Sequence, residues 1–365
     1  MDGIEGTEQT MKKSLMNGLA AMGLTAGLLA QMNAAIAGDQ LTITGGGGSF
    51  QKILREVVFE PFSKSTGTKV TDAEYDYGTA KIRAMVETKT VSWDIVYAGE
   101  AQTRQMCDEG LIETLDWKKL ETFGLDRAKF GDASYTDCGV PSTVTGDVIM
   151  YDAKRLPSSP KTIEDFFDLK KFPGKRGLNK SPVVILEWAL IADGVSINDV
   201  YKVLNTPEGV ARAFKRLDTI KKDVVWWTSG AQPAQLLADG EVVMTHVWTT
   251  RAYDANKNSG KHFEYIWDAA LQAGNAWVIP KGSPNIDAGY KFLAFAGSAH
   301  VQAEVANGTS AGPANKDALK LIDPAVRPYV TNAPERSGIT IQRDTNFWNE
   351  KGDELRQRLT AWLAQ

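Results

Sequence analysis

The sequence predicts an α/β protein of two domains. Short strand-like apolar runs alternate with helical patterns along most of the chain, an order typical of parallel strands with helices packed on them. The length of 365 residues exceeds one ordinary domain, and an apolar content of 43% supports a packed core. The formal net charge of −4 is too small to indicate nucleic acid or an anionic membrane as a partner.

The first 37 residues predict export. Residues 11–14 form a short basic start, residues 18–30 are apolar or small apart from one threonine, and residues 35–37 read Ala-Ile-Ala. This order is typical of a secretory signal, so we expect cleavage after Ala37. A membrane anchor is the alternative, but a spanning helix needs about 20 strongly apolar residues and this run is shorter. Residues 1–10 carry three acids that suit no signal, which leaves Met11 as an alternative start.

The sequence has two cysteines, Cys107 and Cys138, and both follow the signal segment. An isolated pair in an oxidising compartment is expected to form a disulfide, and closing a loop of this length stabilises the fold by roughly 3–4 kcal/mol. Two unrelated buried thiols are the alternative. No Cys-x-x-Cys is present to indicate redox chemistry.

Strand and helix alternate regularly in the first part of the chain. The loops 45–49 and 98–100 follow two of the strands, and ligands bind beyond the carboxyl ends of strands in sheets of this kind. Strands are expected at 41–44, from 69, and at 94–97, and helices at 49–58, 81–86 and 103–110.

A second block begins near residue 148 and contains several further elements. The tail of the chain has an amphipathic helical pattern. Strands are expected at 148–151, 224–227, 242–247 and 275–280, and helices at 183–193, 197–204, 209–222, 288–295 and 344–365.

Four consecutive glycines, 45–48, precede Ser49 and a helix. Such a loop can hold an anion, because its N–H groups are accessible and the helix N-terminus carries partial positive charge. A plain flexible turn is equally consistent with the pattern. The run is neither a P-loop nor a dinucleotide fingerprint, since the residues that those motifs require next are missing.

Two patterns that resemble hydrolase motifs fail on their context. Residues 308–312 match the nucleophile elbow Gly-x-Ser-x-Gly, but that motif needs a histidine after Ser310 and all three histidines precede it. We interpret this segment as a turn. The fragment Ser158-x-x-Lys161 lies between prolines and lacks its partner motifs. The histidines are too far apart to predict a zinc site.

The segment 248–253, Trp-Thr-Thr-Arg-Ala-Tyr, follows an apolar strand and is the strongest candidate for binding. Arg251 offers a planar fork of donors for a carboxylate, and Trp248 offers a flat wall for methylenes or a π-face for a cation. The alternative for Arg251 is an ordinary surface ion pair, which contributes little. The nearby pair 226–227, Trp-Trp, is also consistent with core packing.

Taken in order along the chain, a set of short motifs resembles the periplasmic solute-binding proteins of ABC importers, in the spermidine/putrescine-binding branch. The resemblance covers nearly all of the chain after the signal, and the order of the motifs carries it. They are Phe62-x-x-x-Thr66-Gly67-x-Lys69-Val70, Trp93-Asp94-Ile95-Val96, Asp108-Glu109-Gly110-Leu111-Ile112, Gly139-Val140-Pro141, Tyr151-Asp152, Leu237-Ala238-Asp239-Gly240-Glu241-Val242, Trp277-Val278-Ile279-Pro280-Lys281-Gly282 and Gly312-Pro313-x-Asn315.

The resemblance implies two α/β lobes joined by a hinge of crossing strands, closing over a ligand. Crossings are expected near 139–145, 272–276 and 309–312. Lobe 1 is expected at 38–142 plus 275–309, and lobe 2 at 143–274 plus 310–365. It also implies a periplasmic receptor, neither an enzyme nor a metal or cofactor protein, that acts as a monomer and delivers its solute to an ABC permease in the inner membrane.

The ligand is expected to differ from a polyamine. By segment matching, the acids with which spermidine receptors hold ammonium groups fall here near Ser181, Val184 and Asn275. Only the tryptophan is retained, as Trp248, and Arg251 is added. A buried cation without an acidic partner is unfavourable, and a neighbouring arginine adds repulsion. The site is therefore similar to the branch that takes γ-aminobutyrate-like or other carboxylate ligands, although Asn275 stands where that branch often has an aspartate for the amine.

The expected function is capture of a small carboxylate or zwitterion between the lobes, with Arg251 on the carboxylate and Trp248 on the ligand body. A polyamine receptor that uses Glu100, Glu187 or Asp254 is the alternative, and a secreted hydrolase a remote one. The expected ligand-binding residues are Arg251, Trp248, Gly46, Gly47, Ser49, Thr143, Ser229, Asn275, Thr249 and Glu100.

Overall fold

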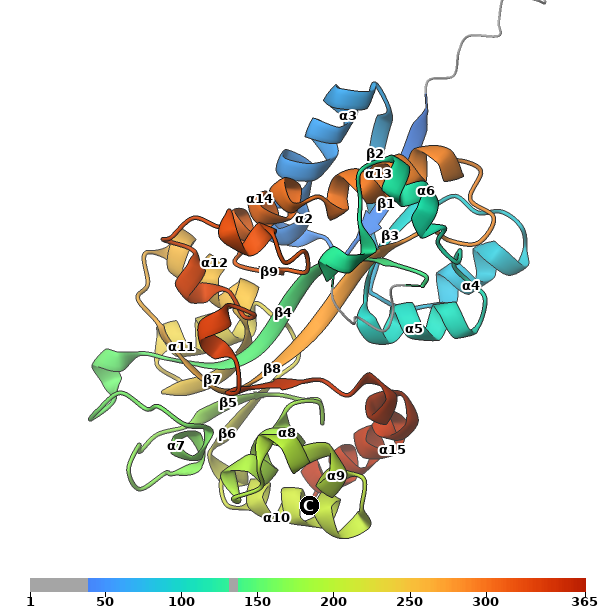
Figure 1. Ribbon diagram of the computed structural model, residues 1–365. Helices are drawn as coiled ribbons and strands as arrows, with labels where there is room; N and C mark the ends of the chain where they lie inside the picture. The colour runs from blue at the N-terminus through green and yellow to red at the C-terminus, as the bar shows by residue number, and fades with distance from the viewer. Residues whose placement is uncertain (1–38, 131–136) are drawn as a thin grey trace, which may run out of the picture.

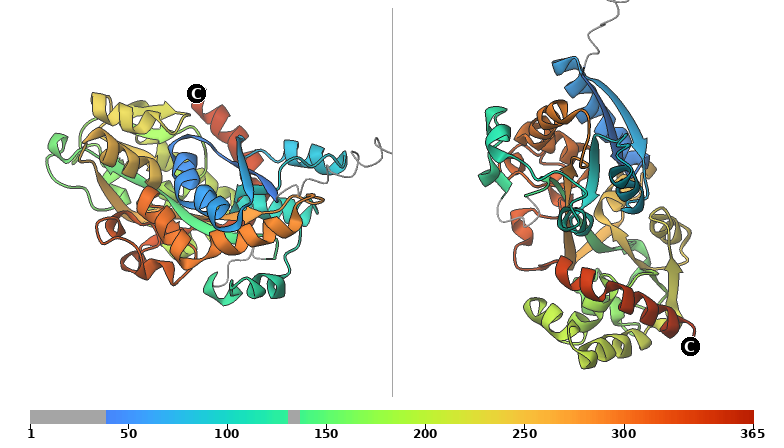
Figure 2. Two further views of the ribbon diagram at one scale, coloured as in Figure 1. Left: turned by 90° about the horizontal axis from the view of Figure 1, so that it is seen from above. Right: turned by 90° about the vertical axis from the view of Figure 1, so that its right-hand side faces the viewer.

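The computed structural model of the protein describes residues 39–130 and 137–365, and the predicted signal segment lies outside them. Within the described chain, ten strands form one mixed sheet in the order β2-β1-β3-β8-β4-β7-β5-β6, with β9 and β10 paired to β4 and β8. Helices surround the two ends of this sheet, and two long strands, β4 and β8, run between the ends (Figure 1). Figure 2 shows the same two lobes from two further directions.

Three parallel strands and the helices around them form the first lobe, as the alternating pattern predicted. Residue Ile43 at the centre is opposite Asp72 on one side and Ile95 on the other. The helix expected at 49–58 is divided, because a π-helical turn at Arg55–Phe59 separates two short helices. The elements are β1 (Gln40–Gly45), β2 (Lys69–Glu74), β3 (Ile95–Gly99), α2 (Gly48–Leu54), α3 (Glu60–Thr66), α4 (Ala80–Glu87), α5 (Glu100–Asp108), α6 (Trp117–Thr122), α13 (Ile286–Gly297) and α14 (Ala299–Thr309).

The second lobe also has a parallel core, in which β5 lies between β6 and β7. Arg176 on β5 is opposite Val224 on one neighbour and Met244 on the other. The helix expected for the tail of the chain is present. The elements are β5 (Arg176–Asn179), β6 (Val224–Trp227), β7 (Met244–Trp248), α7 (Ile163–Phe167), α8 (Ile185–Ala192), α9 (Val200–Leu204), α10 (Pro207–Asp218), α11 (Gln232–Asp239), α12 (Thr249–Ser259) and α15 (Thr345–Leu363).

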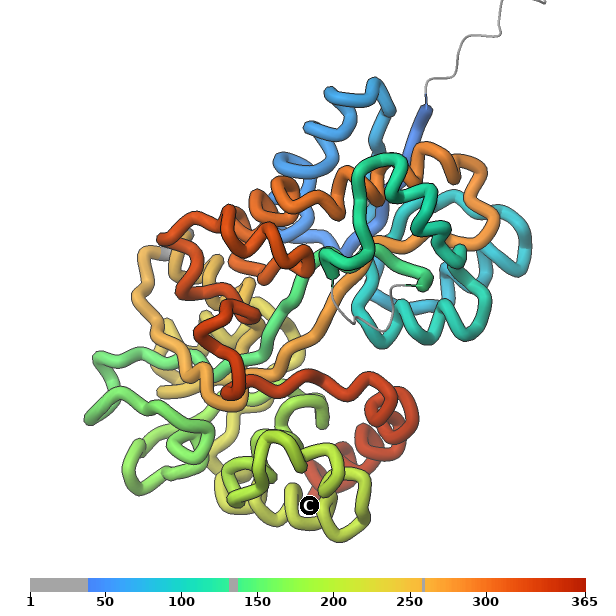
Figure 3. Tube along the Cα trace, in the orientation of Figure 1, coloured from blue at the N-terminus to red at the C-terminus, as the bar shows by residue number. Residues whose placement is uncertain are grey.

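The strands β4 (Val140–Tyr151) and β8 (Glu264–Val278) pair antiparallel and connect the lobes. Thr143 is opposite Asn275 in the stretch between the lobes, and β9 (Gly312–Pro313) pairs with β4 at the same place. The trace in Figure 3 shows these crossings. The first part of β8 was not predicted, because a strand was expected only from residue 275. Alanines, polar residues and a glycine give that part no clear alternation. The strand β10 (Thr340–Gln342) pairs beside it.

Two large hydrophobic clusters fill the lobes. One draws its buried residues from the ranges 41–140 and 277–305, and the other from 149–271 and 341–362. The two clusters share no residue. They support the proposed lobe limits, 38–142 plus 275–309 and 143–274 plus 310–365, which remain a proposal at the level of single residues.

The predicted disulfide is confirmed. Cys107, near the end of α5, is bonded to Cys138, two residues before β4, with their Cα atoms 5.9 Å apart. The disulfide links α5 to the segment just before the crossing strand β4. No helix within the described ranges is long and apolar enough to cross a bilayer.

Candidate functional site

The carboxyl ends of strands from both lobes meet at one contact. Arg251, in the first turn of α12 after β7, donates a hydrogen bond from Nη1 to the Ser49 hydroxyl, 3.2 Å away, at the start of α2 after β1. The two residues are 202 positions apart in sequence and belong to opposite lobes. The structure therefore brings together the glycine loop and the arginine that the sequence analysis identified separately.

The glycine loop at this contact has a fixed conformation that requires glycine. Gly47 and Gly48 adopt φ angles of 70° and 67°, a region that side chains disfavour. A Cβ at Gly47 would lie 2.5 Å from the Glu74 carboxyl group, and a Cβ at Gly46 would lie 2.2 Å from the Tyr77 hydroxyl oxygen. The Gly47 N–H is already engaged, since it donates to Gln51 Oε1 at 3.0 Å. Glycine is therefore needed at these positions, because Glu74 and Tyr77 lie directly against the loop.

Helices that begin at the inner ends of the strands lack side-chain caps. Neither α5 nor α12 has a capping side chain at its N-cap residue, which is Gly99 and Trp248 respectively. Uncapped first-turn N–H groups attract negative charge. Other described helices are of both kinds. Side chains cap α6, α7, α10, α14 and α15, whereas α2, α3, α4, α8, α9, α11 and α13 also lack a side-chain cap.

Trp248 presents an exposed aromatic wall beside Arg251. Its side chain is 40% exposed although the residue closes a buried strand, and its ring meets the buried Trp227 edge-on at 5.9 Å. Gly230 lies against the ring, because a Cβ there would be 2.4 Å from it. The neighbouring Ser229 is exposed, and its N–H donates to Gln232 Oε1 at 2.9 Å. Trp227 is core, as one of the two interpretations of the Trp-Trp pair allowed.

Polar side chains connect the lobes along the crossing strands. The Asn275 amide donates to the hydroxyls of Thr143 and Thr145, both at 3.3 Å, and the Thr143 and Tyr97 hydroxyls are 2.5 Å apart. Asn275 is opposite Gly99 on β3, so this row reaches the start of α5. The predicted polar contacts Thr143 and Asn275 therefore lie beside each other, with their amide and hydroxyl donors directed at neighbours.

Tyr77 is a site candidate that sequence reasoning missed. It follows β2, has a φ of 62° and packs over Gly46. Burial raises the pKa of its phenol, while a hydrogen bond from the Gly46 backbone and the charge of Arg251 lower it. Positive φ in a bulky residue is a strained conformation of the kind that concentrates at functional sites. Nothing in the sequence pointed to Tyr77 beyond its being an aromatic residue near a strand end.

The remaining predicted residues are less favourably placed. Thr249 is buried, and its hydroxyl accepts from the Gly146 N–H at 3.2 Å and from the Thr331 hydroxyl at 3.1 Å, so that oxygen is already used. Glu100 and Asp254 are partly buried, in α5 and α12. Their role as ligand contacts stays a prediction.

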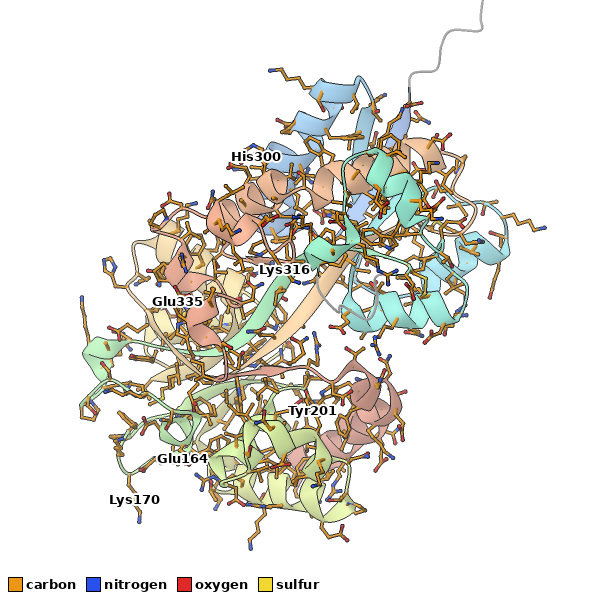
Figure 4. All side chains as sticks on the ribbon, in the orientation of Figure 1. Glu164, Lys170, Tyr201, His300, Lys316 and Glu335 are labelled. Carbon is orange, nitrogen blue, oxygen red and sulfur yellow. A yellow bond between two sulfur atoms is a disulfide. The ribbon has the colours of Figure 1, made fainter. Side chains whose placement is uncertain are left out.

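Glu187 lies inside the second lobe and has no accessible surface. Its Oε1 accepts hydrogen bonds from the Tyr201 hydroxyl at 2.9 Å and from Trp348 Nε1 at 2.8 Å. Burial raises the pKa of its carboxyl group to about 7. Tyr201 is labelled in Figure 4, in the part of the second lobe where α8, α9 and α15 pack. This acid cannot meet a ligand without opening the core.

Ser310 lies where helix α14 ends, which agrees with the interpretation of residues 308–312 as a turn and not as a nucleophile elbow. It is the C-cap of α14, with a φ of 60°, and it is fully buried. Its hydroxyl has no hydrogen-bond partner among the described residues, so no base activates it there. The described residues also contain no group of three or more histidine, cysteine or acidic side chains that could hold a metal ion.

Comparison with known proteins decides the family. A model of the family described as bacterial extracellular solute-binding protein matches residues 58–349. A γ-aminobutyric acid-binding protein of Pseudomonas aeruginosa is 39% identical over 327 residues, which cover 90% of this chain and 92% of the relative. The chain belongs to this family. It is therefore a solute-binding protein of the ABC-importer type and not an enzyme.

Solved structures agree with this fold. The structure of a γ-aminobutyrate receptor is 35% identical, covers 90% of this chain and 98% of its own, and superposes with a TM-score of 0.78. The binding protein MotA of Agrobacterium tumefaciens, solved with glucopine, is 32% identical with a TM-score of 0.76, covering 89% of this chain and 99% of its own. Both support the two-lobed α/β fold with crossing strands.

Proposed function

We propose that this protein is a periplasmic receptor that captures a small carboxylate or zwitterion of the γ-aminobutyrate type between its lobes. The observation that carries the proposal is Arg251, which extends from α12 to the glycine loop of the opposite lobe and donates there to a hydroxyl, not to a carboxylate. A guanidinium at the junction of two lobes, beside an uncapped helix N-terminus, favours a negatively charged ligand group.

The surroundings of Arg251 fit the rest of such a ligand. Trp248 offers an exposed face for methylene groups, and Ser49 places a hydroxyl from the other lobe beside Arg251. Relatives named for γ-aminobutyric acid, and one solved with glucopine, support a carboxylate as the ligand group. Asn275 and Thr143 are expected to supply neutral polar contacts. Closure around the ligand would follow the crossing strands, and delivery would be to an ABC permease in the inner membrane.

Isothermal titration calorimetry on the mature chain tests the proposal. The ligands are γ-aminobutyrate, α-amino acids, dicarboxylates, putrescine and spermidine, and the variants are Arg251→Ala and Arg251→Lys. Loss of a charge-assisted, bidentate pair is expected to weaken carboxylate binding roughly a hundredfold, about 3 kcal/mol, with lysine recovering only part of it.

Arg83→Ala serves as the matched control, because Arg83 forms an exposed ion pair with Glu109 within lobe 1. It is expected to leave affinity unchanged. Tight putrescine binding that survives Arg251→Ala would contradict the ligand class and support the polyamine alternative. Mass spectrometry of the secreted protein checks export, with a mature N-terminus at residue 38 as the expected result.

A further inference from the structure

An acidic residue that the sequence analysis did not single out lies next to Trp248. Asp147 on β4 is directly opposite Trp248 in the antiparallel pairing with β7. Opposed residues in such a pair project to the same face, with Cβ atoms roughly 5 Å apart. The Asp147 side chain is 15% exposed and that of Trp248 is 40% exposed. A carboxylate and an indole face are therefore side by side and both reachable.

Asp147 is held in place by a buried histidine. His246 Nε2 lies 2.7 Å from Asp147 Oδ1, and the imidazole is only 2% exposed. The ring is packed between Trp188, at 5.1 Å, and Trp227, at 5.0 Å. Trp227 is also the residue against which Trp248 packs. Asp147 and Trp248 are therefore both held by the packed pair of His246 and Trp227.

The contact with His246 leaves part of the Asp147 carboxyl group unused. His246 Nδ1 is buried and has no hydrogen-bond partner among the described residues. The histidine contacts only one of the two Asp147 oxygens, Oδ1.

Arg251 and Asp147 are both neighbours of Trp248, Arg251 along α12 and Asp147 across the sheet. Trp248 is the N-cap of α12, and Arg251 is three residues further along, roughly 5 Å along the helix axis. Each charged side chain contacts a different residue: Arg251 donates to Ser49, and Asp147 lies against His246. A cation and an anion that both neighbour one aromatic side chain match a short molecule with a carboxylate at one end and an ammonium group at the other.

We propose that Asp147, positioned by His246, binds the ammonium group of an ω-amino acid whose carboxylate is bound by Arg251. The inference rests on the proposed function and deepens it, because it selects zwitterions over simple carboxylates. It also assigns to Asp147 the charge that the neutral Asn275 cannot supply. Trp248 contributes its π-face to the same cation.

The test compares γ-aminobutyrate with butyrate, which has the same carbon chain without the ammonium group. Calorimetry on the mature wild type is expected to show at least tenfold tighter binding of γ-aminobutyrate. In Asp147→Asn that preference is expected to fall at least tenfold while butyrate affinity changes less than threefold. Asp152→Asn, the same substitution just beyond the same strand, is expected to retain the wild-type preference.

Each other outcome is informative. Equal binding of the two ligands by wild type overturns this inference and leaves the carboxylate receptor intact, whereas binding of neither ligand removes the proposed function first. Equal weakening of both ligands in Asp147→Asn shows a purely structural role and overturns it. Loss of preference in Glu100→Gln with retention in Asp147→Asn assigns the ammonium to the opposite lobe. If Asp147→Asn does not fold, Asp147→Glu keeps the charge, and loss of the preference in that variant contradicts the proposal.

Discussion

Replacing Glu187 by glutamine is expected to remove a pH dependence from the folding stability. Glu187 is fully buried in the second lobe, and its Oε2 has no hydrogen-bond partner among the described residues. Burial raises the pKa of the carboxyl group from 4.5 to about 7, although hydrogen bonds from its own backbone, Tyr201 and Trp348 act in the opposite direction. Desolvation of the charged form is the largest effect.

The sign of the effect follows from proton binding. Because the folded pKa is raised, the folded state keeps a proton between pH 4.5 and about 7 that the unfolded state has released. The contribution of Glu187 to the folding stability is therefore fully present below pH 4.5 and is lost as the pH rises to about 7. The rise in the pKa of Glu187 from 4.5 to about 7 corresponds to about 3 kcal/mol of unfolding free energy, most of which is lost between pH 5 and pH 8.

Urea unfolding of the ligand-free mature chain at pH 5 and pH 8 measures this quantity. Wild type is expected to lose about 2–3 kcal/mol more than Glu187→Gln between the two pH values, because other titrating groups cancel in the comparison. Glu350→Gln on α15, whose side chain is 73% exposed, is expected to follow wild type. Equal losses for wild type and Glu187→Gln would refute the assignment of a raised pKa to this buried acid.

Two further predictions concern stability. Arg176 is fully buried and donates to the carbonyl oxygens of Phe166, Gly174 and Phe172 at 2.7 Å. Because those acceptors lose their donor in Arg176→Met, this variant is expected to be less stable by about 3 kcal/mol or more in urea unfolding, and a change under 1 kcal/mol would contradict the prediction. Cys107→Ser with Cys138→Ser removes a bond across 31 residues and is expected to lower the free energy of unfolding by about 3–4 kcal/mol, whereas wild type and the double variant should unfold alike under reducing conditions.

The fold could be predicted well from local pattern. Alternating strands and helices, the glycine after α3 and the order of family motifs predicted two α/β lobes, and the long tail helix is where periodicity placed it. Two local details were missed. The π-helical turn at 55–59 has no composition that distinguishes it from α-helix, and the first part of β8 lacks the alternation by which strands are recognised.

The site was predicted in part. Arg251 and the glycine loop follow strand carboxyl ends, a position that pattern alone identifies, and the structure brings them into contact. Tyr77 was missed because its significance lies in a φ angle and in its packing over Gly46. Asp147 was missed because nothing along the sequence links it to a tryptophan about a hundred residues away; the register of β4 and β7 does so.

The sequence by itself determined the predicted export segment, the pair of cysteines, the alternation of strands and helices, and the presence of an arginine and a tryptophan at a strand end. These are local properties of composition and spacing. Only the tertiary structure decided which charged groups are accessible. Glu187 and Asp147 are both single acids in apolar surroundings, but packing against α15 buries the first, and pairing with β7 places the second beside an exposed indole. Burial and cross-strand neighbours depend on residues far away in the chain, so no local pattern could have distinguished the two.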